Sequence, residues 1–503
     1  MKSLAHLSIL VCSLALVATA TTLPSTASAA GFEVGENTPE STARGGTGVV
    51  NKSDPSAVYF NPALLGRTGS LELLLSSNFL TMDVEFQRDD FYAEPGGEPD
   101  RTFDPVTNQT GVFPAPFVTA AFDVGPDALS MGGGVWGPPA YGNPCYGTLD
   151  DGVCEPDREG AARGMAVETD MVVAYTGIGA GYTFDLDDDR TFNIGLTAAL
   201  AYQTTDFAVV VEADAPSTPW RENPDREAFV RGQDLSGFAP TGILGVAYED
   251  APLRLAASYR PPIRWDVTGR ADVDYPAYLD GQDPALSDDT MSLQTWQAGK
   301  LRLGWGLEWG EHPADADRPR WNLEFNTIWE NWSLVEHFRI DLEGDIEARA
   351  FGSDGDYPTV VEFHPVYQRK GYQDTFSLRS GLSYGINSWL TAHAGGFLET
   401  PAQPNAYTSA DFISWERYAA SAGASLHLPY NLEFDIGYTY IHSPSRTVTN
   451  GEVYNPIPMS ECRGPDFEAD ACEQPGEPPG NPQNEGQWRA HFQILSAGMT
   501  WRY

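Results

Sequence analysis

The sequence has 503 residues and carries 70 Asp and Glu against 30 Lys and Arg, a formal net charge of −40 at pH 7. This charge excludes nucleic acid as a partner, because its phosphates are held by cationic side chains. Hydrophobic residues make up 41%, aromatic residues 12%, and glycines number 50, which excludes a bundle of membrane helices and is typical of membrane strands that are apolar on one face only.

Residues 1–29 have the features of a signal peptide. Lys2 supplies the charged start, Leu7 to Ala20 the apolar core, and Ala27-Ser28-Ala29 a small-residue cleavage site. The core is shorter than the about 20 apolar residues that a membrane-spanning helix needs. We therefore expect an exported chain whose mature form begins near Ala30.

The next stretch, residues 30–65, is rich in glycine and small residues and lacks the alternation that a membrane strand needs. It ends in Asn61-Pro62-Ala63, where Pro62 fixes its own φ and restricts Asn61. Because everything after it alternates, we expect residues 30–65 to form a hatch that plugs the lumen of a barrel built by residues 66–503.

Phe32 is the first aromatic residue of the expected mature chain and follows Gly31. A free, glycine-flanked terminus moves at low energetic cost. Phe32 is therefore predicted to enter an apolar substrate pocket when that pocket is empty, with Asn61, Pro62 and Ala63 at the other end of the gate. The alternatives are that Phe32 is a core residue of the plug and that Asn-Pro-Ala is a tight turn.

Strict alternation marks the strands of residues 66–503. In 431–440, for example, Leu432, Phe434, Ile436, Tyr438 and Tyr440 share one face and polar or small residues share the other. Trp and Tyr near many strand ends are typical of membrane girdles. The pattern predicts an all-β fold, a transmembrane antiparallel β-barrel of about 14 strands, at 71–86, 112–123, 128–137, 167–184, 191–211, 237–249, 253–268, 295–310, 320–342, 372–386, 389–399, 416–427, 431–442 and 488–503.

The connections alternate in length. Short ones, such as Asp250–Pro252 and Asn387–Ser388, alternate with long acidic ones, such as Ala271–Gln294 and Ser443–Gln487. Short periplasmic turns and long outer loops are the pattern of an outer-membrane barrel, and an even strand count places both barrel ends on the periplasmic side.

The last strand ends on alternating apolar residues, among them Leu495, Met499 and the terminal Tyr503. That ending resembles the C-terminal signal recognised by the outer-membrane insertion machinery. Earlier in the strand the apolar residues are in the opposite phase, so we expect a β-bulge near Ile494. The residues in this opposite phase are Trp488, Ala490, Phe492 and Ile494.

Four cysteines follow the signal peptide, and four cysteines allow three connectivities. Each pair is close in sequence and lies in a stretch rich in Pro, Gly and Asp, so we expect the local bridges Cys145–Cys154 and Cys462–Cys472. No Cys-x-x-Cys or Cys/His cluster indicates a metal site, and no cofactor is expected.

Two glycine motifs have a structural explanation. Gly381-x-Ser383-x-Gly385 matches a nucleophile elbow, but it lies inside an alternating strand with no histidine at a meaningful position. Gly132-x-Gly134-x-x-Gly137 matches a dinucleotide fingerprint, but no helix follows. We expect Gly132, Gly133 and Gly134 to allow a kink in the third strand, because glycine weakens a strand interior.

Three arginines, Arg260, Arg302 and Arg379, fall on the lumen face by parity. Charges on the lipid face at mid-strand would cost about 2–4 kcal/mol each, so the lumen is the stable choice. They are candidates for binding a substrate carboxylate. The alternative is that they pair with acids of the wall, Asp266 or Glu308, or of the hatch, Glu33, Glu36 or Asp54. In the same parity, Ile263, Trp265 and Val267 are assigned to the lipid face and Arg264 and Asp266 to the lumen.

Several segments resemble the FadL family of outer-membrane transporters for long-chain fatty acids and other hydrophobic compounds, including toluene-type hydrocarbons. They are Ala30-Gly31-Phe32, Asn61-Pro62-Ala63, and the segments 117–138, 245–269, 371–404 and 486–503. The chain departs from the family at Gly371-Tyr372-Gln373, where a Trp often precedes Asp-Thr, in its acidic loops and in its two cysteine pairs.

The resemblance implies a monomeric fourteen-stranded barrel in the outer membrane of a Gram-negative-type bacterium. It implies a hatch in the lumen, a kinked third strand that opens the wall, and lateral release of substrate. The implied partners are a long-chain fatty acid or other hydrophobic small molecule, outer-membrane lipid, and the insertion machinery during biogenesis. The expected function is passive uptake of hydrophobic compounds, without catalysis; the alternatives are a general porin for polar solutes, an outer-membrane enzyme and an adhesion barrel.

Overall fold

The structure is a computed structural model that describes residues 33–52, 54–68, 71–90, 99, 101–124, 128–137, 144–150, 153–155, 157, 159–212, 227–275, 284–311, 319–352, 355–361, 365–454 and 482–503. Phe32, Cys462, Cys472 and the expected signal peptide lie outside these residues. Within them, no helix has the length and apolar character needed to cross a membrane.

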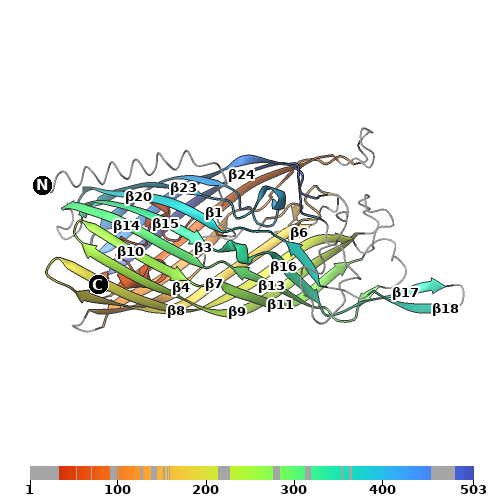
Figure 1. Cartoon of the computed structure of the whole chain (residues 1–503), viewed down its shortest axis with the longest axis horizontal. Coiled ribbons are helices and arrows are strands. Elements are labelled where there is room, and N and C mark those ends of the chain that lie inside the picture. Colours follow the sequence, from red (N-terminus) through yellow and green to blue (C-terminus); the bar gives the residue numbers. More distant parts are fainter. Residues whose placement is uncertain are drawn as a thin grey trace.

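Fourteen antiparallel strands close into one barrel, as predicted (Figure 1). Closure is made by β1 and β24, which pair without a break from Glu72 opposite Arg502 to Arg88 opposite Gly486. In order around the wall the strands are β1 (Glu72–Arg88), β3 (Phe113–Asp123), β4 (Leu129–Trp136), β7 (Glu168–Asp185), β8 (Arg190–Glu212), β9 (Glu227–Asp250), β10 (Leu253–Arg260), β14 (Lys300–Glu311), β15 (Pro319–Glu330), β20 (Thr375–Asn387), β21 (Leu390–Glu399), β22 (Arg417–Leu428), β23 (Leu432–Val448) and β24 (Gly486–Arg502).

Short strands extend the wall at the end that carries the long connections. Four barrel strands are each interrupted toward this end and continued by a short strand. The continuing strands are β11 (Ile263–Asp274) for β10, β13 (Thr290–Gln297) for β14, β16 (His337–Leu342) for β15 and β19 (Val366–Arg369) for β20. A hairpin of β17 (Ile346–Gly352) and β18 (Gly355–Val361), joined by β12 (Ala285–Leu286), projects from this end (Figure 1). The remaining short strands are β2 (Val106–Thr107), β5 (Thr148–Asp150) and β6 (Val153–Glu155).

The interruption changes which side chains face inward. On β10 the alternation places Tyr259 outside and Arg260 inside, and after Pro261-Pro262 it places Ile263, Trp265 and Val267 inside. The assignment of these three residues to the lipid face was therefore wrong, as was that of Arg264 and Asp266 to the lumen, since both are exposed. Across the two prolines the inward positions change from even-numbered to odd-numbered residues, which a constant alternation along the strand does not anticipate. The predicted strand 320–342 is likewise split, by η4 (Trp332–Leu334) between β15 and β16.

The bulge expected near Ile494 is absent. The β1–β24 register runs through it unbroken, and Trp488, Ala490, Phe492 and Ile494 all face the lumen and are buried. The prediction failed because it assumed an apolar residue must face lipid. In fact the inward face of both strands changes chemistry along its length. It is polar at Ser76, Asn78, Ser496 and Thr500, and apolar at Leu80, Val84, Phe86, Phe492 and Trp488.

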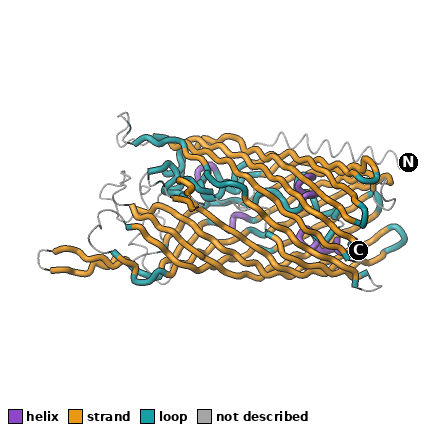
Figure 2. The backbone as a smooth tube through the Cα atoms, turned by 180° about the vertical axis from the view of Figure 1, so that it is seen from behind, coloured by secondary structure: helices purple, strands orange, loops and turns teal. Residues whose placement is uncertain are grey.

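Residues 33–68 lie inside the barrel, and we call them the plug (Figure 2). The plug has only short helices, α2 (Pro39–Ala43), α3 (Ala57–Phe60) and η1 (Pro62–Arg67). Glycines of the wall let it approach closely: a Cβ on Gly195 would lie 2.2 Å from the Pro62 carbonyl carbon, and one on Gly245 would lie 2.0 Å from Asn61 Oδ1. The plug therefore occupies the half of the lumen nearer the short turns, which we call the inner lumen. The half nearer the long loops is the outer lumen.

Candidate functional site

Polar side chains of the inner-lumen wall form hydrogen bonds with the backbone of the plug. A chain with so little regular structure leaves many carbonyl groups without internal partners, and buried carbonyls need hydrogen bonds. Wall side chains on four different strands supply them. The bonds are Asn78 to the Glu36 carbonyl (3.1 Å), Thr197 to Val58 (2.8 Å), Ser258 to Phe60 (2.7 Å) and Thr439 to Thr42 (2.8 Å).

Charged side chains add to this anchorage. Glu324 of β15 is fully buried, accepts from the Val50 backbone N–H (2.9 Å) and pairs with Arg44 (3.4 Å). Within the plug itself, Lys52 pairs with Glu40 at 2.9 Å. Breaking a buried pair by removing one partner is strongly destabilising, because the other charge stays buried. The plug is thus held to the wall by charge as well as by backbone bonds.

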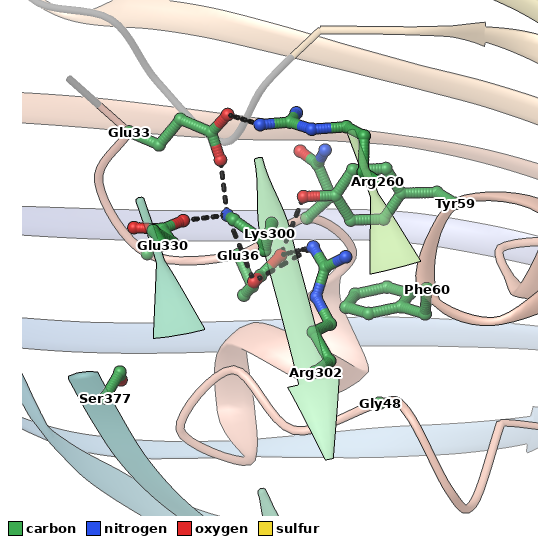
Figure 3. Close-up of polar contacts among 12 residues, drawn as sticks. Glu33, Glu36, Gly48, Tyr59, Phe60, Arg260, Lys300, Arg302, Glu330 and Ser377 are labelled. Carbon is green, nitrogen blue, oxygen red and sulfur yellow. Dashed lines mark hydrogen bonds and ion pairs between the residues drawn. The ribbon is translucent and has the colours of Figure 1, made fainter. Parts of the chain in front are cut away.

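The first described residue of the plug is Glu33, whose carboxylate is directed at Lys300 and Arg260 (Figure 3). Its carboxylate contacts Lys300 Nζ at 2.5 Å, accepts from Arg260 at 3.0 Å and accepts from the Gln297 amide at 2.8 Å. Gln297 is oriented by Tyr175, whose hydroxyl donates to its Oε1 at 2.9 Å. The three donors converge on one carboxylate from β10, β13 and β14.

Glu36 forms the second centre of this charged layer. It accepts from the Tyr59 hydroxyl at 2.7 Å and pairs with Arg302 at 3.3 Å and with Arg379 at 3.7 Å. Tyr59 also lies under the Arg302 guanidinium, with 5.0 Å from Cζ to the ring centroid. Glu36 is therefore enclosed by groups of the plug and of two wall strands.

Among the described residues, the ion pairs of this charged layer join four acids to five bases, and all nine side chains are buried. The acids are Glu33, Glu36, Glu330 and Glu399, and the bases are Arg260, Lys300, Arg302, Arg379 and Arg417. This charge balance favours an anion over a cation at this level of the lumen.

The outer lumen, by contrast, is lined with apolar side chains. Its aromatic residues are packed together: Phe86 stacks on Trp488 with centroids 3.9 Å apart, and Trp415 meets Trp488 at 6.2 Å. Two connecting segments, around Met165 and around Phe412, reach in from the loops and are buried there. The lining from the wall includes Leu80, Val84, Val173, Trp265, Val267, Leu293, Phe338, Phe492 and Ile494.

In the described part of the chain, two further buried ion pairs lie toward the loops, beyond the membrane-spanning strands: Lys370–Asp411, and Arg163–Glu227 at 2.8 Å. Lys370 pairs with Asp411, and its Nζ lies 4.6 Å from the Phe338 ring centroid. Burial lowers the pKa of the Lys370 ammonium, and the Asp411 carboxylate offsets part of that effect. The Lys370–Asp411 pair ties the inward-folded 401–415 segment to the wall.

The three arginines proposed as substrate ligands converge as parity predicted, but each has a carboxylate partner. Arg260 pairs with Glu33, Arg302 with Glu36, and Arg379 with Glu399. Arg260 and Arg302 thus pair with acids of the hatch, whereas Arg379 pairs with Glu399 of the wall at 3.1 Å and with Glu36 of the hatch at 3.7 Å. Of the wall acids suggested as partners, Asp266 faces outward and Glu308 pairs with Arg254.

Asn61, Pro62 and Ala63 are buried at the start of η1, and the Asn61 side chain accepts from the Ala63 N–H at 3.1 Å. Gly132, Gly133 and Gly134 lie in β4, whose register with β3 and β7 is unbroken. The kink expected at these glycines remains a prediction. Among the described residues β4 ends at Trp136, and Phe113–Pro116 of β3 and Glu168–Ala174 of β7 are not paired with it.

The Cys145–Cys154 disulfide is present, as the local pairing predicted, with Cα atoms 5.7 Å apart. The pairing of Cys462 with Cys472 remains a prediction. Among the described residues, no group of His, Cys, Asp and Glu could hold a metal ion.

Sequence reasoning missed two features. Lys300 was not singled out, although it shares the parity of Arg302; a lone lysine beside a strand break carries no local motif. Ser383 does have a histidine nearby: its Oγ lies 2.7 Å from His393 Nδ1, and His393 Nε2 lies 2.8 Å from Ser425 Oγ. These residues lie on β20, β21 and β22, within the polar wall that faces the plug.

Comparison with known proteins was made on sequence and on structure. A family model described as "Outer membrane protein transport protein (OMPP1/FadL/TodX)" matches residues 20–464. A "Long-chain fatty acid transport protein" from Salmonella typhi is 23% identical over 208 residues, 41% of this chain and 43% of that protein. The match thus spans less than half of that relative's length.

Solved structures share the fold across nearly the whole chain. The crystal structure of a Pseudomonas aeruginosa FadL homologue has a TM-score of 0.69 at 15% identity and covers 94% of this chain and 100% of that one. The Pseudomonas putida toluene transporter TodX has a TM-score of 0.56 at 14% identity, covering 93% and 99%.

Proposed function

Because this chain belongs to the outer membrane protein transport family (OMPP1/FadL/TodX), we propose that it takes up hydrophobic compounds passively across the outer membrane. The compounds are long-chain fatty acids or hydrocarbons, as the names of its relatives suggest. The observation that carries the proposal is the change of the inward wall from polar to apolar at the level of Glu33.

An apolar chamber suits such substrates on energetic grounds. Keeping apolar surface in water costs roughly 25 cal/mol per Å². An outer lumen with buried apolar clusters, Trp265 in one and Trp488 and Phe492 in another, removes that surface from water, whereas an aqueous pore does not. In this mechanism substrate enters from the loops, where Phe412 and Met165 now fill the chamber.

The proposed exit is lateral, because the plug blocks the inner lumen. Among the described residues β4 ends at Trp136, which belongs to a buried apolar cluster, and Phe113–Pro116 of β3 and Glu168–Ala174 of β7 are not paired with it. A substrate leaving there would pass into outer-membrane lipid. We further propose that the barrel acts as a monomer and is assembled by the outer-membrane insertion machinery.

A general porin is disfavoured by the buried plug, and a catalytic role is disfavoured by the setting of Ser383 and His393, both of which are buried beneath the plug in the membrane wall. Two measurements on the same purified barrel test the proposal. In planar bilayers we expect little steady conductance. In cells lacking other uptake routes, we expect the barrel to accelerate uptake of a labelled long-chain fatty acid or of toluene. A large, stable ion conductance without such uptake would contradict the proposal and favour the porin.

A further inference from the structure

The outward face of the wall carries exposed aromatic side chains at the end with the short turns. They include Tyr182, Phe184, Trp309, Trp389 and Tyr503. Trp and Tyr gather where a membrane barrel meets the lipid head groups, and the short turns of an outer-membrane barrel are periplasmic. These side chains therefore mark the head-group level of the inner leaflet of the outer membrane.

On the neighbouring strands β14, β15 and β20 the aromatic side chains form a continuous row (Figure 1). The register sets Trp309 opposite Trp321, and Trp321 opposite Tyr384. The Trp309 and Trp321 rings are stacked with centroids 5.9 Å apart, and the Trp321 and Tyr384 centroids are 4.2 Å apart. The row is thus a platform of three packed rings that faces the lipid.

The guanidinium of Arg320 lies on this platform. Arg320 is the second residue of β15 and shares the parity of the inward Glu324, but its side chain reaches the outward Tyr384. Its Nη2 donates to the Tyr384 hydroxyl at 2.9 Å, and its Nε donates to the Gly385 carbonyl at 3.3 Å. Its Cζ lies 5.1 Å from the centroid of the Tyr384 ring. These contacts orient the guanidinium at the head-group level.

Arg320 lacks the acid partner that other arginines at this end of the barrel have. Arg190 pairs with Asp187, and Arg502 pairs with Glu72 at 3.2 Å. In the part of the chain that the structure describes, no carboxylate forms an ion pair with Arg320, and its Nη1 donates to no protein acceptor. A guanidinium has five N–H donors and binds phosphate through two parallel N–H···O bonds. A phosphodiester at the membrane surface therefore complements this side chain in charge and in geometry.

Apolar side chains continue the platform away from the short turns. The next outward row on the same three strands is Leu307, Leu323 and Leu382. The row after it contains Trp305 and Phe325, whose rings are stacked with centroids 4.6 Å apart. An acyl chain that lies along these rows covers apolar surface over its whole length. A cation at the head-group level beside an apolar lane has the layout needed to hold a phospholipid.

We propose that this part of β14, β15 and β20 binds one phospholipid of the inner leaflet, with the phosphodiester on Arg320 and an acyl chain along the leucine row. The short-turn end is otherwise rich in exposed acids, which include Asp188, Asp189, Asp250 and Glu311. These acids repel an anionic head group and attract an ammonium group, so the head group that fits is the zwitterionic phosphoethanolamine. The inference goes beyond the uptake function and does not depend on it, because the site faces away from the lumen.

The test compares two lipids that differ only in their head group. Native mass spectrometry of the purified full-length barrel in detergent measures binding of didecanoyl phosphatidylethanolamine and of didecanoylglycerol, which has the same chains but no phosphate. Arg320→Gln should lower the affinity for phosphatidylethanolamine about tenfold and leave the affinity for the diglyceride unchanged. Arg320→Lys keeps the charge but not the fork of donors, and its affinity should fall between those of the parent and Arg320→Gln. Heat-dependent mobility in gel electrophoresis checks that each variant is folded.

Arg190→Gln is the matched control, because Arg190 is an exposed arginine at the same end whose guanidinium is already held by Asp187. This variant should bind both lipids as the parent does. Leu323→Ser, in the leucine row, should lower the affinity for both lipids alike.

The inference is overturned if Arg320→Gln binds phosphatidylethanolamine as tightly as the parent. It is also overturned if Arg190→Gln loses as much affinity as Arg320→Gln, because binding would then depend on overall charge rather than on this site. Displacement of phosphatidylethanolamine by an equal concentration of inorganic phosphate would contradict it as well, since the acyl chains would then contribute nothing to binding.

Discussion

The two halves of the lumen are built from the same strands and solve opposite problems. On β1 and β24 the inward residues of the inner half include the polar Ser76, Asn78, Ser496 and Thr500, and Asn78 and Ser496 hydrogen-bond each other. In the outer half the same strands present Leu80, Phe86, Phe492 and Trp488. The inner wall satisfies the backbone of an irregular segment, and the outer wall excludes water. Side chains alternate between the outward and inward faces along the whole strand. The inward residues can therefore be polar in the inner half and apolar in the outer half.

The largest effect should come from breaking the inner half. Glu324→Ala removes the acceptor for the Val50 N–H and the wall acid that pairs with Arg44, whose other acid partner, Glu40, lies in the plug. Loss of one member of a buried pair costs about 3–5 kcal/mol, so the plug should detach while the barrel stays folded. Conductance in planar bilayers and influx of a small polar solute should both rise clearly.

An exposed acid on the neighbouring strand β14 offers a control. Glu311→Gln, at the end of β14, should leave conductance at the parental level. If Glu324→Ala shows the same conductance and solute influx as the parent, the buried charges of the inner half do not hold the plug in place.

An intermediate effect should follow from making the outer half polar. Phe492→Asn places an amide in the chamber without a hydrogen-bond partner provided by the wall. An unsatisfied buried polar group costs about 1–3 kcal/mol, and affinity for an apolar ligand should fall by about tenfold or more. Conductance should not change, in contrast to Glu324→Ala.

Gln493→Asn is the matched control, because Gln493 is the next residue of β24 and faces outward. Ligand binding measured by tryptophan quenching should be normal in this variant. Equal losses in the two variants would mean that the inward face of the outer half is not the binding surface.

The smallest effect is expected at the hinge between plug and wall. Pro62 lies against Gly195 and Gly245, and alanine preserves that packing. Pro62→Ala should act through chain entropy, at about 0.4–1 kcal/mol, and raise leakage of polar solutes only slightly. Leakage as large as in Glu324→Ala would show that the turn, rather than the ion pairs, keeps the plug in place.

The strand number, the closure and the position of the plug could be predicted from the sequence because each rests on alternation or on its absence. The change of the inward face from polar in the inner half to apolar in the outer half could not be predicted in this way. An apolar run in the wrong phase, as at Trp488 to Ile494, has two explanations, a bulge or an apolar lumen, and local sequence does not decide between them. After β10, the shift in alternation at Pro261-Pro262 obscured the same change from polar to apolar inward residues. The arginines were found by parity, but their partners depended on where a plug without periodicity would lie.

One position of the proposed gate stays a prediction, since Phe32 lies outside the described residues. The hypothesis that Phe32 enters an apolar pocket when that pocket is empty is compatible with Val34 belonging to an apolar cluster. Phe32→Ala should then alter uptake rate or ligand affinity in a folded barrel. Unaltered uptake and affinity would leave Phe32 as a packing residue.

The central claim is that ligand occupies the apolar outer half above a closed, charged inner half. The most direct test is a crystal structure of the barrel with dibromostearic acid, in which anomalous scattering locates the bromine atoms. The account predicts bromine peaks in the outer lumen among Trp488, Phe492 and Trp265, with the plug still bound to Glu324 below. Peaks in the inner lumen beside the plug, or only on the outside of the wall, would contradict it.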